Sequence, residues 1–327
     1  MNRLFALACF FIYSISFAQN IGFEKDAFAH TYSIVARDTI TGEMAVAVQS
    51  HWFSVGPLVA WGRAGVGVVA TQSFVNPAYG PEGLDLMENG MSAEQALTQL
   101  IEQDEGRAYR QVAFLDDTGS VSAFTGENCV EAAEHLTGKH FSVQANMMLN
   151  DEVVTAMARA YMQFDKYPVA ERVMEALKAA QETGGDIRGK QSAALIVVGP
   201  EKTSKEWKEK KIDLRVDDHP EPVKELDRLL KVSRAYEHMN RGDLAVEEGD
   251  MTKALEEYGA AEKMFPGNLE MKFWKAVALA NNGRIEEAKP IFQSIFEEDE
   301  NWKEMLTRLP KSGLLSISES ELEELTK

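Results

Sequence analysis

The chain has 327 residues and a formal net charge of -18 at pH 7, and 45% of its residues are hydrophobic. This length favours about two globular domains, and the hydrophobic fraction is typical of a soluble protein. The strong negative charge argues against a nucleic-acid-binding protein and against one that binds anionic membrane surfaces, because both need a basic patch.

The first 18 residues have the pattern of a secretory signal peptide. Arg3 precedes a short apolar run, and a cleavage site of small residues ends at Ala18. This run is too short for a stable membrane anchor, and no later run qualifies. We expect a periplasmic or extracellular protein with residues 19–30 as its leader. Cleavage leaves Cys129 as the single cysteine, so no disulfide can form within one chain.

Three β-patterned runs follow the leader. Residues 32–36 and 44–49 are β-prone and flank a turn, and residues 65–71 form an apolar run typical of a strand that is covered on both faces. Polar residues gather at the ends of these runs, where functional sites are common. These residues are Thr31, Gln49, Ser50, Thr71, Gln72 and Ser73.

The next part of the chain mixes helices and strands. In order, the sequence predicts helices at 81–87 and 92–101, a hairpin of strands 110–116 and 120–124, a strand at 141–148, helices at 151–164 and 169–182, and a strand at 191–198. We expect Glu131, Glu134 and His135 on the surface of a further helix. This order fits layered sheets with helices outside them better than a strict βαβ alternation.

The composition changes after Pro200. Residues 201–211 are dense in charge, residues 217–222 have the pattern of a bend, and everything beyond them has a helical pattern. We therefore divide the chain after its leader into a first domain of residues 31–215 and a helical domain of residues 216–327.

The helical domain contains an internal repeat with a period of 34 residues. Glycine, alanine and aromatic residues recur at this spacing, in the pairs Gly249 and Gly283, Ala254 and Ala288, and Tyr258 and Phe292. The pattern resembles the tetratricopeptide repeat, in which small residues let paired helices approach and aromatic residues fill the gaps. So short a repeat cannot form a long groove, and we expect it to pack on the first domain or on another chain.

Several motifs of the first domain occur together, namely TYSIVARD, VAVQS, RAGVGVVATQS, NPAYGPEGL, FSVQANM and GGDIRGKQSAAL. Together they resemble a family of bacterial and archaeal proteins of unknown function that is assigned to the Ntn-hydrolase-like fold, over residues 31–198. The resemblance implies an α+β fold with a four-layer αββα sandwich, followed here by a small all-α domain of the tetratricopeptide-repeat type.

The resemblance also implies a mechanism. In active Ntn hydrolases the first residue of the first strand attacks an amide carbonyl, and its own α-amine, which titrates near neutral pH, acts as the base. Thr31 matches this position, and it gains a free amine only if the bond after His30 is cut. The alternative that stays open is a structural one, in which Thr31 is a β-branched residue at the start of a strand.

An amide hydrolase also needs hydrogen-bond donors that face the developing oxyanion. The candidate catalytic residues are Thr31, Asn146, Gln144 and Asp186, and the candidate substrate-binding residues are Ser50, Gln72, Ser73 and Arg188. Asp186 and Arg188 lie in a glycine-rich turn, where they can form an orienting or carboxylate-binding pair. The alternative for each is an ordinary structural role at a sheet edge or in a surface turn.

Two functions therefore stay open. The first is a secreted Ntn-type amidohydrolase that acts on a small amide or peptide-like substrate. The second is a non-catalytic envelope protein that binds a ligand in the same pocket and binds peptidoglycan or a protein through the helical tail. We expect no cofactor or metal, because the six histidines are scattered and no zinc or dinucleotide motif occurs. A homodimer is open in either case.

Overall fold

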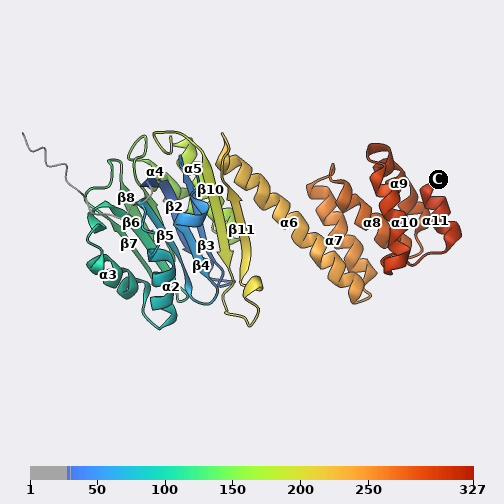
Figure 1. Cartoon of the computed structure of the whole chain (residues 1–327), viewed down its shortest axis with the longest axis horizontal. Helices are drawn as coiled ribbons and strands as arrows, with labels where there is room; N and C mark the ends of the chain where they lie inside the picture. The colour runs from blue at the N-terminus through green and yellow to red at the C-terminus, as the bar shows by residue number, and fades with distance from the viewer. Residues whose placement is uncertain (1–27, 30) are drawn as a thin grey trace, which may run out of the picture.

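The structure is a computed structural model that describes residues 28–29 and 31–327, so the expected signal peptide lies outside the described residues. An α+β domain with two sheets comes first, and a helical domain follows it (Figure 1). The predicted α+β class with a helical tail is thus confirmed. Of the helices in the described part of the chain, none is long and apolar enough to cross a membrane.

The larger sheet has six antiparallel strands. In spatial order they are β11 (Lys210–Val216), β10 (Ser192–Val198), β3 (Met44–Ser50), β2 (Thr31–Arg37), β9 (Phe141–Ala145) and β8 (Glu134–Gly138). The central strands β2, β3 and β10 are buried almost throughout, as their near-continuous runs of Val, Ala and Ile predict. Thr31, the first residue of β2, therefore lies at the end of a central strand of this sheet.

The smaller sheet has five strands. Four of them lie in the order β1 (Phe28–Ala29), β5 (Gly67–Phe74), β6 (Arg110–Asp116) and β7 (Val121–Thr125), and β4 (Ala60–Arg63) also pairs with β5. The predicted hairpin joins β6 to β7 through a turn in which Gly119 has a φ of 84°. β1 and β2 are neighbours in the chain but belong to different sheets, so the chain passes from one sheet to the other just before Thr31.

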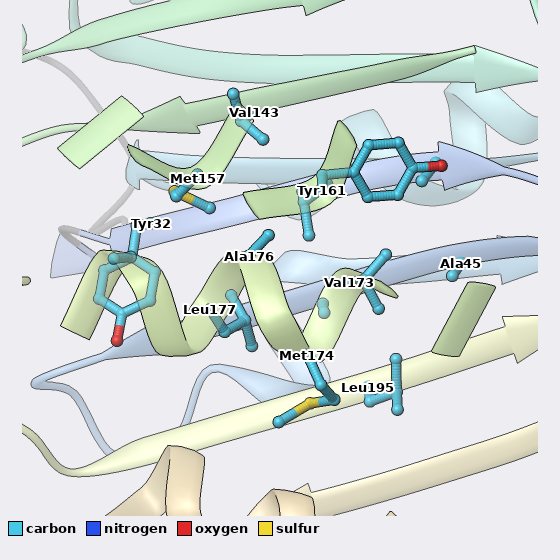
Figure 2. Packing of buried hydrophobic residues seen from close by; sticks show 14 of the residues in the cluster. Tyr32, Ala45, Val143, Met157, Tyr161, Val173, Met174, Ala176, Leu177 and Leu195 are labelled. Atoms are coloured by element: carbon cyan, nitrogen blue, oxygen red, sulfur yellow. The ribbon is translucent and has the colours of Figure 1, made fainter. Parts of the chain in front are cut away.

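The two sheets pack face to face, and helices cover their outer faces. Between the sheets, Val46 and Val48 of β3 belong to one buried cluster with Val68 and Ala70 of β5. The outer face of the smaller sheet carries α2 (Tyr79–Glu88) and α3 (Ala93–Gln103). The outer face of the larger sheet carries α4 (Val153–Gln163) and α5 (Val169–Glu182), whose packing is shown in Figure 2. Shorter helical segments are α1 (Gly56–Val59), η1 (Arg107–Tyr109) and η2 (Glu206–Lys208).

The long helix α6 (Pro222–Glu247) joins the two domains (Figure 1). Its first half contributes Leu226 and Leu230 to the core under α4 and α5, whereas Met239 in its second half packs into the helical domain. An ion pair between Arg234 and Glu171 of α5, at 2.8 Å, fixes the middle of the helix. The hydrogen bond to Glu171 outweighs desolvation and raises the pKa of Arg234. The helix therefore connects the domains as one continuous element.

The helical domain continues with α7 (Met251–Met264), α8 (Leu269–Asn281), α9 (Ile285–Glu298), α10 (Asn301–Ser312) and α11 (Glu319–Thr326). The members of each predicted repeat pair take equivalent places. Gly249 and Gly283 both have a positive φ, of 76° and 71°, just before α7 and α9. Ala254 and Ala288 are both fully buried one turn into those helices. The 34-residue period therefore corresponds to a repeated structural unit.

Four strands differ from the sequence prediction or were missed by it. The two-residue strand β1 lies in the expected leader and was not predicted. The segment with Glu134 and His135 is the edge strand β8 rather than a helix, and His135 Nδ1 lies 2.8 Å from Thr125 Oγ1 of β7. The short strand β4 was not predicted. β11 lies in a charged stretch that has no strong strand pattern, because its exposed residues are charged and only Ile212 and Val216 are buried. Charged residues are typical of edge strands, where they prevent pairing with other chains.

Candidate active site at the start of the central strand

Thr31 begins β2 at the point where the chain leaves the smaller sheet. Two residues earlier, Ala29 lies opposite Ser73 of β5 in an antiparallel pair. Across the larger sheet, Thr31 lies opposite Ser50 of β3, and Ser50 lies opposite Ser192 of β10. All three hydroxyl residues of this row are fully buried. The sheet thus ends in a row of hydroxyl side chains that begins at Thr31 and continues through Ser50 to Ser192.

The alternation of β2 shows which way these side chains face. Ile34 belongs to the core under α4 and α5, and Val35 belongs to the core between the sheets. Because side chains alternate along a strand, Thr31 and Ser33 face the smaller sheet, as Val35 does. Polar residues therefore fill one end of the space between the sheets, and apolar residues fill the rest.

A continuous hydrogen-bonded network occupies this polar end. Gln144 Nε2 donates to Ser33 Oγ at 2.6 Å, and Ser33 Oγ donates to Gln72 Oε1 at 2.6 Å. Gln72 Nε2 then donates to Gln111 Oε1 at 2.7 Å, and Asn146 Nδ2 donates to the same oxygen at 2.9 Å. All five side chains are fully buried. Such bonds polarise one another, so the network holds its members in one arrangement.

The network converges on the backbone of Thr31. Its carbonyl oxygen accepts hydrogen bonds from the backbone N–H of Asn146 at 3.1 Å and from Gln72 Nε2 at 3.2 Å. Asn146 Nδ2 lies 3.5 Å from the same oxygen. Three of the four candidate catalytic residues, Thr31, Asn146 and Gln144, are therefore joined through one network, together with the substrate-side candidate Gln72.

Sequence reasoning missed Gln111 and Ser33, which hold this network together. The Gln111 amide also donates from Nε2 to the carbonyl oxygen of Ala145 at 2.9 Å and to Thr125 Oγ1 at 2.9 Å. The signal in the sequence was weak, because Ser33 is a small polar residue inside a β-patterned run and Gln111 follows Arg110 at the start of another. Only the pairing of β2 with β9 and of β5 with β6 brings them to the same place.

A short ribbon next to the network carries Asp186. Met148 pairs with Asp186 in an antiparallel bridge, so the chain beyond β9 lies beside the glycine-rich turn before β10. Asp186 Oδ2 accepts from the backbone N–H of His51, which follows Ser50 at the end of β3. The ribbon thus extends from the end of β9 to the end of β3, and β2 lies between these two strands.

Asp186 and Arg188 form the predicted ion pair. Arg188 Nη2 lies 2.7 Å from Asp186 Oδ2, and Nε donates to Oδ1 at 3.1 Å. The Asp186 side chain is fully buried, whereas a quarter of the Arg188 side chain is exposed. Arg188 Nη2 is also 3.5 Å from Ser50 Oγ, the hydroxyl beside Thr31 in the row. The structure therefore brings Asp186, Arg188 and Ser50 to the same end of the sheet as Thr31.

The edge of β5 beside β1 is rigidly held. Ser73 has a φ of 74°, which is uncommon for a residue with a side chain. Arg110 Nη1 donates to the Phe74 carbonyl oxygen at 2.7 Å, and Arg110 Nε donates to Asp104 Oδ2 at 2.8 Å. Burial raises the pKa of Asp104, but the hydrogen bond and charge of Arg110 outweigh this, so the net effect lowers that pKa. Tyr79 donates to the same carboxylate at 3.0 Å.

The chemistry of the hydrogen-bonded network around the Thr31 carbonyl is that of neutral amides and hydroxyls. The donors to the Thr31 carbonyl are a glutamine and an asparagine, which can hold a polar group but cannot accept a proton near neutral pH. Within residues 28–29 and 31–327, no group of three or more His, Cys, Asp or Glu side chains is placed to hold a metal ion. Cys129 donates its thiol to the Arg110 carbonyl oxygen at 3.4 Å, and burial raises its pKa.

Comparison with known proteins identifies the family. Residues 31–226 match a family of unknown function (DUF1028), and residues 245–309 match the tetratricopeptide repeat. A solved structure of protein SPO2555 from Silicibacter pomeroyi, described with the same family, is 31% identical, with a TM-score of 0.56 over 62% of this chain and 85% of that chain. A search of curated proteins gave no match. The chain therefore belongs to the DUF1028 family and carries a tetratricopeptide repeat after the family domain.

Proposed function

We propose that this protein is a secreted Ntn-type amidohydrolase, with Thr31 as its N-terminal nucleophile and a small amide or peptide-like substrate. The observation that carries the proposal is the place of Thr31, at the head of the central strand, in the polar end between two sheets, with its carbonyl fixed by Gln72 and Asn146. The family match begins at the same residue. Secretion rests on the sequence of residues 1–18 alone.

The layers of the first domain support this proposal. Helices α4 and α5, the larger sheet, the smaller sheet, and helices α2 and α3 follow one another. We take this order as the αββα sandwich of the Ntn-hydrolase-like fold, in which the nucleophile heads a central strand. Fold and function are separable, so the chemistry has to follow from the site itself.

The site favours the α-amine of Thr31 as the base, because the groups that hold this residue are neutral amides. Once the bond before Thr31 is cut, its amine accepts the hydroxyl proton as Oγ1 attacks the amide carbon. The amine half of the substrate leaves with that proton, and an ester forms on Thr31. Water then hydrolyses the ester, which releases the acid and restores the hydroxyl.

The other candidate residues take roles that follow from their contacts. Asn146, whose Nδ2 donates to Gln111 Oε1 and lies 3.5 Å from the Thr31 carbonyl oxygen, supplies a donor to the oxyanion. Gln144 is a positioning residue, because it holds Ser33, which in turn holds Gln72. Asp186 orients Arg188, whose partly exposed guanidinium faces the substrate side beside Ser50.

Labelling of the nucleophile tests the proposal without a known substrate. A chain that begins at Thr31, released from a ubiquitin fusion, is treated with a β-lactone that acylates N-terminal threonine. We expect one adduct, mapped by mass spectrometry to Thr31. The chain that retains residues 19–30 and the Thr31→Ala variant serve as controls and stay unlabelled. Equal labelling of all three chains, or none of the trimmed chain, contradicts the proposal.

The complete burial of Thr31 in the chain that keeps its leader favours a second candidate, a non-catalytic envelope protein. Such a protein would bind its ligand at the same end of the sheets and bind peptidoglycan or a protein through the helical tail. Retention on purified peptidoglycan that is lost when residues from about 215 onward are removed supports this candidate. Turnover of any amide by the trimmed chain, abolished by Thr31→Ala, contradicts it.

A further inference from the structure

The leader pairs with the smaller sheet immediately before the candidate nucleophile. Phe28 lies opposite Phe74 and Ala29 lies opposite Ser73, in an antiparallel pair at the edge of β5. The bond that must be cut joins residue 30 to Thr31. The residues that pair with β5 are therefore on the acyl side of that bond, two and three positions before Thr31.

We propose that this edge of β5 binds the acyl half of the substrate as an extended peptide, in the position that the leader takes before cleavage. The inference rests on the proposed function, because it assigns the substrate class of the same site. The Thr31 hydroxyl has one position in the site. The acyl half of a later substrate therefore has to approach it from the side where the leader now lies.

The edge of β5 is preorganised for such a ligand. Arg110 is 4% exposed and holds the Phe74 carbonyl, while Asp104 holds Arg110. The ring of Phe74 also packs edge-on against Tyr109, with their centroids 5.3 Å apart. An edge that is fixed in this way loses little conformational freedom when a strand adds to it, and this favours binding. The strained φ of Ser73 fits a functional position, since such strain is concentrated at binding and active sites.

When an extended peptide adds to a sheet edge, the edge recognises the peptide backbone more than the sequence of its side chains. The main chain of the ligand supplies the hydrogen bonds, and side chains contribute mainly through alternate positions. The substrate class that fits is therefore a peptide, or an acylated peptide, with at least two residues on the acyl side of the scissile amide. A simple amide without a peptide backbone would lack these hydrogen bonds.

Binding of the leader peptide tests this inference without any reaction. The probe is a fluorescent peptide with the sequence of residues 24–30, Glu-Lys-Asp-Ala-Phe-Ala-His, measured by anisotropy with the trimmed chain that carries Thr31→Ala. We expect binding at least about tenfold tighter than to the chain that keeps its own leader, because there the edge is already paired. Equal affinity for the two chains, or no binding to the trimmed chain, overturns the inference.

Peptides with one methylated backbone nitrogen show whether the main chain is recognised. Residues of an antiparallel pair bond across it alternately, so methylation at one of the positions of Phe28 and Ala29 should weaken binding at least about tenfold, and methylation at the other much less. No weakening by either methyl group overturns the inference. If the β-lactone labels Thr31 but the peptide does not bind, this inference is wrong and the proposed function stands. If the peptide binds but Thr31 is not labelled, the proposed function is wrong.

Discussion

We predict opposite effects on stability when each of two buried glutamines is replaced by leucine. Gln111 is fully buried, and its side chain makes hydrogen bonds with Gln72, Asn146, Thr125 and two backbone carbonyls. Gln49 is also fully buried, but neither its Oε1 nor its Nε2 has a hydrogen-bond partner within the described residues. Replacement of each by leucine keeps a similar volume and removes only the amide.

We expect Gln111→Leu to lower the free energy of unfolding by about 3 to 5 kcal/mol, since it leaves several buried partners without their hydrogen bonds. The loss stays below the sum of five complete bonds, because Gln72 and Asn146 keep their contacts with the Thr31 carbonyl. We expect Gln49→Leu to raise the same free energy by about 1 to 3 kcal/mol, because it removes an unpaired buried amide.

Urea unfolding of the whole chain, followed by circular dichroism, measures both effects on the transition of the first domain. The pair is its own control, since length, charge and hydrophobicity change equally in the two variants. If Gln49→Leu destabilises the protein as strongly as Gln111→Leu does, the network has no special role and the reasoning about the polar end of the sheets fails.

Three further predictions concern other parts of the chain. Gly242→Ala places a methyl group 2.5 Å from an aromatic ring of α7, so we expect it to destabilise the protein by about 1 to 3 kcal/mol and to lower the thermal midpoint. Gly259→Ala has open space around it and should raise the thermal midpoint. Equal shifts of the two midpoints contradict the packing of the repeat. Because the pKa of Asp104 is lowered in the folded state, its carboxylate stabilises the protein at neutral pH, and this contribution is lost as the pH falls below about 4. Asp104→Asn should therefore be less stable at pH 7 and decline less between about pH 5 and 3 in urea titrations, and an unchanged pH profile contradicts the pairing with Arg110. Cys129 should react with iodoacetamide at least about tenfold more slowly in the folded protein than in urea, because burial raises its pKa; equal rates contradict that burial.

The sequence predicts the elements whose local pattern is strong. The apolar runs predict β2, β3 and β10, and the structure contains all three strands. The predicted helix at 92–101 is α3, which begins after Ser92 with a capping box. β11 could not be predicted in the same way, because its stability comes from pairing with β10 and its exposed residues are charged. The same holds for β8, which was assigned to a helix although it pairs along its whole length with β9.

The site was only partly predictable for a similar reason. The family resemblance pointed to Thr31, and the need for hydrogen-bond donors pointed to Asn146 and Gln72. Their convergence, however, depends on the register between β2 and β9 and on the packing of one sheet against the other. Gln111 belongs to the same network, yet its position beside Arg110 at the start of a predicted strand carries no local signal of function. Long-range pairing, which a single sequence does not show, decides which polar residues meet.

The enzyme hypothesis depends most directly on which residue begins the mature chain. Purification of the protein from its native host, followed by mass spectrometry of its N-terminal peptide, identifies this residue without any assumption about the substrate. We expect a chain whose first residue is Thr31 with a free amine. A population that begins only at Gln19, with no form that begins at Thr31, would contradict the hypothesis.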